Sequence, residues 1–216
     1  MQILLLKYLH HKRGSKFQAV HSASSSPGCP LPLLMLAIRA FPNQIREADE
    51  HSGNGNLPLH MVASWGIKPS RREEQEDARA PARYVASKDP IAQRTKAMVV
   101  SELLTEYPDA ARVRNKRGKT PLALLVEAGG TWFNGGVRRM VRAYPEALNI
   151  RDRKTGLMPF MAAAAACRGS NARDGSYADL KALTTIFELL RNEPRAVRPS
   201  SRTRKKKKRS EANRQR

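Results

Sequence analysis

Three times, this chain repeats one order of residues: an aromatic residue and a proline, then a polar stretch with glycine, then a second proline that opens an apolar run. The two prolines are 16, 13 and 14 positions apart, so the length varies only in the polar stretch. A surface loop between two fixed helices tolerates such variation. The pattern therefore predicts a helix, an exposed loop and a second helix in each copy. The copies are AFPNQIREADEHSGNGNLPLHMV (40–62), EYPDAARVRNKRGKTPLALL (106–125) and AYPEALNIRDRKTGLMPFMA (143–162).

Apolar residues before each aromatic and proline recur at i, i+3, i+4 and i+7, which is one face of an amphipathic helix. The first proline of each copy ends that helix, because its ring removes an amide donor and disfavours helical geometry in the preceding residue. The second proline fits the first turn of the next helix, where the missing amide costs nothing. Thr120 can cap its helix with its hydroxyl. The sequence therefore predicts an all-α fold whose inner helices start at Pro58, Pro121 and Pro159.

The second and third copies lie 37 to 38 residues apart, a spacing typical of stacked structural repeats, whereas Pro42 and Pro108 of the first and second copies are 66 residues apart. The segments NKRGKTPLALLVEAGG and GNGNLPLHMVASWG resemble the ankyrin repeat, a polar turn with glycine followed by Thr-Pro-Leu-His and an inner helix. Ala123 and Met161 replace the family's histidine, and two of three copies lack the threonine. The resemblance implies an ankyrin-like helical repeat solenoid of about three and a half degenerate repeats over residues 31–197. It also implies that His60 hydrogen-bonds near the start of its helix and steadies the turn.

In ankyrin arrays the polar turns project as fingers, and fingers and inner helices line a concave binding surface. By this resemblance the function is non-enzymatic protein–protein interaction, as an adaptor or scaffold, with a partner protein of unknown identity. Trp65, Trp132 and Phe133 lie at loop mouths, where they can pack on the neighbouring repeat or anchor a partner. The residues predicted to contact the partner are Arg114, Asn115, Lys116, Arg117, Arg151 and Asp152.

Three segments fall outside this pattern. Residues 1–30 carry four Lys and Arg and no acid, which predicts a disordered basic leader and leaves an organelle transit peptide open. Residues 67–94 hold prolines and no apolar stripe, which predicts a polar insertion between inner and outer helices, with a hidden degenerate repeat as the alternative. Residues 198–216 are predicted to be a disordered polybasic tail.

The tail accounts for much of the formal charge of +21, since residues 195–216 hold 11 Lys and Arg against one acid. A run of six cations predicts either a nuclear localisation signal read by an import receptor or a phosphate-binding patch. The tail has no aromatic residue to stack on bases, so any nucleic-acid binding is expected to be non-specific. A tail that only improves solubility is the third interpretation. The run is Arg204, Lys205, Lys206, Lys207, Lys208 and Arg209.

No combination of nucleophile, base and metal ligands is visible, so the sequence predicts no enzyme, cofactor or metal site. The two cysteines lie far apart and indicate neither a disulfide nor a zinc site. No apolar run is long enough to span a membrane. We expect a monomer in the nucleus, with the cytoplasm left open. The alternative function is a nucleic-acid- or ribosome-associated protein that binds through its tail.

Overall fold

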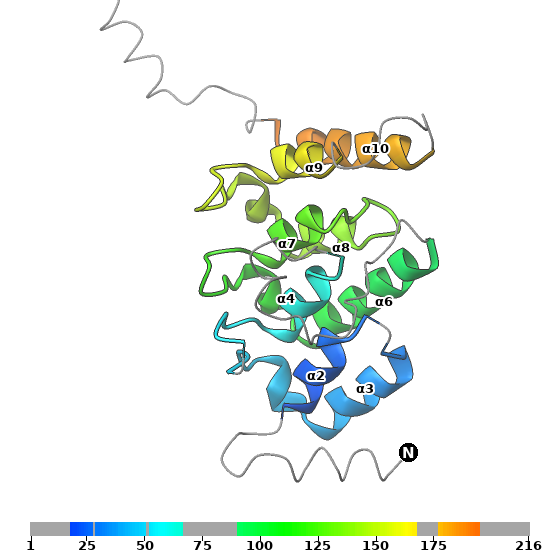
Figure 1. Cartoon of the computed structure of the whole chain (residues 1–216), viewed down its shortest axis with the longest axis vertical. Helices are drawn as coiled ribbons and strands as arrows, with labels where there is room; N and C mark the ends of the chain where they lie inside the picture. The colour runs from blue at the N-terminus through cyan, green and yellow to red at the C-terminus, as the bar shows by residue number, and fades with distance from the viewer. Residues whose placement is uncertain (1–17, 28, 51, 67–89, 168–176, 195–216) are drawn as a thin grey trace, which may run out of the picture.

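The structure is a computed structural model, which describes residues 18–27, 29–50, 52–66, 90–167 and 177–194 (Figure 1). These residues form helices joined by loops and contain no strand, which confirms the all-α class. None of their helices is long and apolar enough to cross a membrane. The α-helices are α2 (Ala19–Ser25), α3 (Leu31–Ala40), α4 (Pro58–Ala63), α6 (Pro90–Glu106), α7 (Pro121–Glu127), α8 (Val137–Ala143), α9 (Pro159–Cys167) and α10 (Tyr177–Asn192).

The helices pack in pairs, and the pairs lie one above another along the long axis of the molecule (Figure 1). The pairs are α2 with α3, α4 with α6, α7 with α8, and α9 with α10. One column runs from α2 through α4 and α7 to α9, and a second column runs from α3 through α6 to α8. Each of these helices except α10 therefore packs against its own partner and against a helix of a neighbouring pair.

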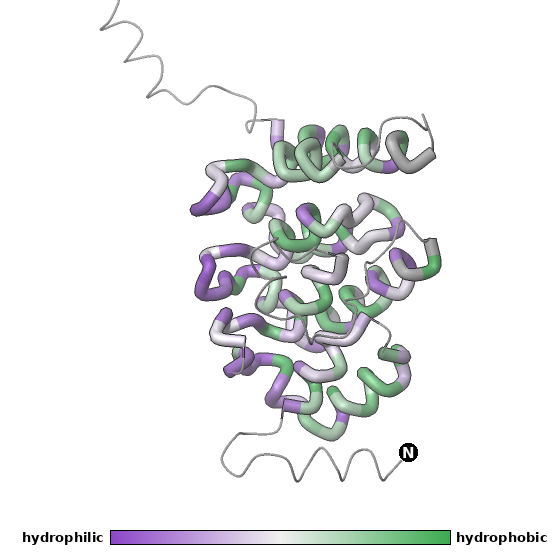
Figure 2. Tube along the Cα trace, viewed as in Figure 1, coloured by the Kyte–Doolittle hydropathy of each residue, from purple (hydrophilic) through white to green (hydrophobic). Residues whose placement is uncertain are grey.

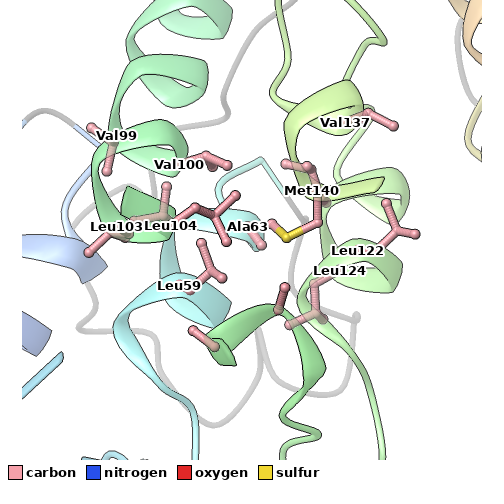
Figure 3. Packing of buried hydrophobic residues seen from close by; sticks show 14 of the residues in the cluster. Leu59, Ala63, Val99, Val100, Leu103, Leu104, Leu122, Leu124, Val137 and Met140 are labelled. Carbon is pink, nitrogen blue, oxygen red and sulfur yellow. The ribbon is translucent and has the colours of Figure 1, made fainter. Parts of the chain in front are cut away.

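The buried apolar residues form one cluster that reaches from Val20 in α2 to Leu189 in α10. Figure 3 shows the middle of this cluster, to which Leu59 of α4, Leu103 of α6 and Met140 of α8 belong. All three side chains are almost completely inaccessible to solvent. The apolar stripes expected before the aromatic and proline thus point into the core at Leu34, Val100 and Val137 as well.

The first proline of each copy follows an α-helix and opens a short 3-10 helix. These are η1 (Pro42–Ile45), η2 (Pro108–Arg112) and η3 (Pro145–Asn149). Proline fits their first position because it has no N–H to lose there. The second prolines begin α4, α7 and α9, as the sequence predicts.

The aromatic residue before the first proline is a contact point between neighbouring units. The guanidinium of Arg46 lies over the ring of Tyr107, 5.2 Å from its centre. One unit further, Arg112 lies over Tyr144 at 5.6 Å. Both arginines stand four residues after a first proline, and both tyrosines stand directly before the next one. Cation–π contacts of this kind stabilise a folded protein by about 0.5–1 kcal/mol at exposed sites.

After α10, Glu193 and Pro194 stand where the three copies have an aromatic and a proline, and the contact at this place is different. Asn149 occupies the position of the two arginines, and Glu193 stands before Pro194. The amide of Asn149 donates a hydrogen bond of 2.9 Å to the Glu193 carboxylate. The unit-to-unit contact is therefore kept with different chemistry.

The prediction of a disordered leader over residues 1–30 is wrong for its last part, since α2 lies within it. Val20 is fully buried, and its N–H donates to the side chain of Gln44 at 3.1 Å. The indole N–H of Trp65 donates to the carbonyl of Ser24 at 2.8 Å. These distant polar contacts hold a helix that has too few apolar residues to be recognised locally. The first helix pair, α2 with α3, is therefore complete in the part of the chain that the structure describes.

The predicted insertion over 67–94 is too long, because α6 begins at Pro90. Helices α4 and α6 pack against each other, so the segment between them separates the two helices of one pair. Residues 67–89 lie outside the described residues, as do residues 1–17 and the polybasic tail.

The packing of α2 can be tested with two substitutions in that helix. Val20→Ala removes part of a fully buried side chain and is expected to lower the free energy of unfolding by about 1–3 kcal/mol. Ser22→Ala changes an exposed residue and is expected to stay within about 0.5 kcal/mol of the wild type. Chemical denaturation measures both. Equal, negligible effects of the two would mean that α2 does not pack on the rest.

Candidate binding surface

Three polar loops follow the 3-10 helices and project on the same side of the molecule, at the left of Figure 1. We call them loop 1 (residues 46–57), loop 2 (113–120) and loop 3 (150–158). Figure 2 shows that their tips are the most hydrophilic part of this edge. They occupy the positions of the predicted fingers, and the residues predicted to contact a partner lie on loops 2 and 3.

Each loop is closed by a backbone hydrogen bond in the same register. The donors are the N–H groups of Asp49, Asn115 and Asp152, each seven residues after the first proline. The acceptors are the carbonyls of Asn56, Lys119 and Leu157, each two residues before the second proline, at 2.8 to 3.0 Å. All variation in loop length is therefore confined to the tips beyond this bond.

The side chain at the closing position ties the loop to itself. The Asn115 side-chain oxygen accepts a hydrogen bond from the N–H of Lys119 at 2.9 Å. An oxygen of Asp152 accepts from the Thr155 hydroxyl at 2.8 Å, and Asp49 accepts from the N–H of Ser52 at 3.0 Å. Asp and Asn favour turns for this reason, because their short side chains reach nearby backbone groups.

Two of the residues predicted to contact a partner, Asn115 and Asp152, have a structural role in the loops instead. Asn115 and Asp152 are only 6% and 7% exposed, and their polar atoms are engaged within the loops or with neighbours. A partner could not reach them without breaking those bonds. They shape the loops and do not form the contact surface.

Neighbouring loops touch through a glycine and a cation. Gly55 and Gly118 both stand three residues before a second proline and have positive φ angles, +61° and +77°. A β-carbon on Gly118 would lie 2.7 Å from Cδ of Arg153, and one on Gly55 would lie 3.0 Å from Cγ of Lys116. The stem of each cation therefore lies across the glycine of the preceding loop. Glycine is needed there for its backbone angle and for this close approach.

Hydrogen bonds add to the contact between loops 1 and 2. The N–H of Lys116 donates to the carbonyl of Asn54 at 2.9 Å, and the guanidinium Nε of Arg117 donates to the Asn54 side chain at 2.8 Å. Behind them, the amide of Asn115 donates to the side chain of Asn56 at 2.9 Å. The two loops thus form one connected surface.

Lys119 connects loop 2 to α7 and loop 3. Its ammonium lies 2.6 Å from both carboxylate oxygens of Glu127 and 3.8 Å from Oδ2 of Asp152. Burial acts to raise the pKa of Asp152, but hydrogen bonds from Thr155 and Lys154 and the charge of Lys119 outweigh it and hold this pKa below its ordinary value. Asp152 therefore stays ionised. The carboxylates of Glu127 and Asp152 balance the positive charge of Lys119.

The exposed charged side chains of loops 2 and 3 are all cations. Loop 2 exposes Arg114, Lys116 and Arg117, and loop 3 exposes Arg151, Arg153 and Lys154. The acid of loop 3, Asp152, is buried. Loop 1 differs, since it holds three acids against Arg46. Loops 2 and 3 therefore form a basic surface, which we call the basic loop surface. Arg153 and Lys154 were missed by the sequence reasoning, although they directly follow Asp152.

The starts of two inner helices have the expected polar contacts. Nδ1 of the completely buried His60 accepts a hydrogen bond from the N–H of Leu57 at 3.3 Å. Burial lowers the pKa of His60 to about 4, so its ring is neutral at physiological pH and can act as an acceptor. The hydroxyl of Thr120 accepts from the N–H of Ala123 at 3.3 Å.

The aromatic residues at the loop mouths divide into two kinds. Trp65 and Trp132 are 6% and 7% exposed and belong to the core. The N–H of Trp132 also donates to the hydroxyl of Thr185 at 2.9 Å, which connects this loop to α10. Phe133 is 64% exposed. Of the three, only Phe133 is available to a partner.

Lys96 on α6 is a buried cation that the sequence reasoning missed. Its ammonium donates to the carbonyl of Trp65 at 2.8 Å, just beyond the end of α4. Burial lowers the pKa of Lys96 to about 7. A signal was present, because Lys96 lies four residues before Val100 and thus on the buried stripe of α6. At 2% exposure its amine is closed to any substrate, so its role is to satisfy a carbonyl at the end of α4.

Among the described residues, no three His, Cys, Asp or Glu side chains gather where they could hold a metal ion. No protein-family model matches the chain, and neither a curated protein nor a solved structure matches it significantly. The geometry of the described residues is therefore the basis for any statement of function.

The contact between loops 2 and 3 can be tested with a matched pair of glycines. Gly118 and Gly156 hold equivalent positions with φ of +77° and +70°, but only at Gly118 would an added β-carbon meet a neighbour within 4 Å. Replacing either by alanine strains the backbone by about 1–2 kcal/mol. Gly118→Ala is expected to lower the free energy of unfolding further, because it also displaces Arg153. Equal losses in chemical denaturation would contradict the inter-loop contact.

The burial of Lys96 predicts a pH dependence of stability. Between pH 7 and about 10.5 the unfolded chain holds a proton on Lys96 that the folded chain has lost, so the free energy of unfolding rises with pH. Lys96→Met is expected to remove this rise, whereas Lys116→Met, at an exposed lysine, is expected to keep it. Denaturation curves at several pH values measure the slope. An unchanged slope in Lys96→Met would mean that this lysine is not buried.

Proposed function

We propose that this chain is a protein-binding module of the ankyrin type, a solenoid of four degenerate helical repeats that acts as an adaptor or scaffold and not as an enzyme. The observation that carries this proposal is the recurrence of the same contacts in successive units. The loop-closing bond, the cation over the glycine and the arginine over the aromatic each return at the same distance from the prolines. Stacked repeats keep such register because each one buries its apolar face on its neighbours.

The basic loop surface is the proposed contact region. Loop 2 is held to loop 3 by Lys119 with Asp152 and by Arg153 across Gly118, and to α7 by Lys119 with Glu127, so a partner would meet a surface that needs little ordering on binding. Asp152, the one acid in loops 2 and 3, is buried, so no exposed acid of these loops offsets their exposed cations. The proposed partner is therefore a protein that presents Asp and Glu side chains to loops 2 and 3, because complementary charge favours encounter and register.

The tail supplies the proposed location. Arg204 to Arg209 lie outside the described residues, so this part of the proposal rests on the six consecutive cations. We propose that an import receptor reads them and brings the chain to the nucleus. Non-specific binding of the tail to nucleic acid is the competing role.

A charge reversal tests the contact region in the full-length chain. Arg114→Glu with Arg151→Glu reverses two exposed cations, one on each basic loop, and is expected to reduce recovery of labelled partner proteins roughly tenfold. The matched control is Arg39→Glu with Arg94→Glu, which makes the same charge change on exposed residues of α3 and α6. Proximity labelling followed by mass spectrometry measures recovery.

Two outcomes of this experiment would oppose the proposal. Equal losses in the two double variants would show that overall charge, and not the loop surface, governs recovery. Recovery that survives the loop substitutions but disappears after nuclease treatment would favour the nucleic-acid alternative.

The tail is tested separately. Deleting residues 202–216 from a fluorescent fusion removes all six consecutive cations and is expected to abolish nuclear accumulation. Because the deletion leaves the described helices intact, denaturation of the purified variant should match the wild type. Unchanged nuclear accumulation would refute the localisation proposal.

A further inference from the structure

The last helix, α10, exposes an apolar face that no described element covers in full. Leu180, Leu183 and Phe187 lie at i, i+3 and i+7 on one side of this helix and are 59% to 62% exposed. Phe133, on the loop before α8, is 64% exposed and lies beside the same helix. We call these four residues the α10 patch.

A pocket adjoins the patch. Its volume is about 210 Å³, and Phe133 and Leu180 line it together with Trp132, Asn134, Lys181 and Thr184. Pockets for drug-sized molecules usually have roughly 300–1,000 Å³. This pocket is too small for such a ligand and suits one large apolar side chain that projects from a partner.

The position of the patch makes it unusual. Helix α10 belongs to the pair at one end of the stack (Figure 1). Terminal units of stacked helical proteins need a polar outer face to remain soluble. A row of three large apolar side chains at such a place marks an interaction site.

The sequence next to α10 offers no large apolar side chain to cover the patch. Residues 168–176 and 195–216 contain no Leu, Ile, Met, Phe, Tyr or Trp. A second copy of the chain is disfavoured by charge, because each copy carries a formal net charge of +21. These observations argue against the segments that flank α10 and against a second copy as the occupant.

The charges around the patch indicate what that molecule carries. Arg191 lies one turn beyond Phe187 and its side chain is 69% exposed, with a contact of 3.5 Å to Glu188. Arg138 and Arg139 are exposed at the start of α8, where the N–H of Arg138 donates to the carbonyl of Trp132 beside the pocket. Helix α8 carries no acid. Cations are thus exposed on α10 itself and at the start of α8, next to the loop that lines the pocket.

We propose that the α10 patch is a second docking site, distinct from the basic loop surface, and that it binds an acidic amphipathic helix of a partner protein. The partner's apolar face lies along Leu180, Leu183 and Phe187, and one of its large side chains enters the pocket beside Phe133. Its carboxylates face Arg191, Arg138 and Arg139. Docking of an amphipathic helix on an apolar groove is a common mode of peptide recognition.

The test uses the full chain and two synthetic fluorescent peptides of about 18 residues, or five helical turns. Both have Leu and Phe on one face, and the other face carries Glu in the first peptide and Lys in the second. Fluorescence anisotropy is expected to show binding of the Glu peptide and at least about tenfold weaker binding of the Lys peptide. Equal binding of both peptides, or no binding of the Glu peptide, overturns the proposal.

Two matched variants locate the site. Phe187→Ser is expected to weaken binding of the Glu peptide by roughly tenfold, whereas Leu36→Ser is expected to leave its affinity unchanged. Both residues are 62% exposed, and Leu36 lies on α3 in the pair at the other end of the stack, so both variants should fold. Equal effects of the two substitutions would overturn the assignment to α10.

Two further measurements exclude other occupants. Light scattering is expected to give a monomer for the wild type, and a dimer that Phe187→Ser dissociates would show that a second copy covers the patch. Vesicles of phosphatidylcholine with phosphatidylserine are expected to bind wild type and Phe187→Ser equally. Loss of vesicle binding in the variant would show that the face meets a membrane instead.

Discussion

The contact between consecutive helix pairs is the interaction on which the rest of the structure depends. Six of the eight described α-helices have ten residues or fewer, a length at which an isolated helix is marginal in water. Their stability must come from burial, and a single pair offers too little of it. Each column of helices supplies that burial step by step, which is why the core is one continuous cluster. The distance between neighbouring loops is set by this stacking, because each loop connects consecutive helix pairs.

Loop geometry follows from the same constraint. Because the pairs lie at fixed positions, the loops between them reach the same edge and can touch, through Lys116 over Gly55 and Arg153 over Gly118. The acid in loop 3 is buried as a turn residue, which leaves cations at the tips of loops 2 and 3. The surface is basic because the acid closes its loop in the interior while the cations face solvent. It is connected because neighbouring loops touch. The apolar α10 patch has a different origin, since it lies where the stack ends.

Local patterns predicted much of this fold and missed what depends on distant contacts. Proline positions and apolar stripes located the helices from α3 onward, because both act within a turn or two of the chain. Helix α2 was missed because Gln44 and Trp65, far along the sequence, hold it. At the surface, sequence placed Arg114, Lys116, Arg117 and Arg151 correctly on exposed loops. It could not show that Asn115 and Asp152 turn inward, since charge and polarity alone do not distinguish a turn residue from a contact residue.

The central claim, that successive units repeat one closed loop geometry, is tested most directly by amide hydrogen exchange. The N–H groups of Asp49, Asn115 and Asp152 donate the three loop-closing bonds. Their exchange, measured residue by residue by NMR in the full chain, is predicted to be slowed to a similar extent as that of the amides in α4 and α7. Exchange of these three amides as fast as that of free loop amides would contradict the account.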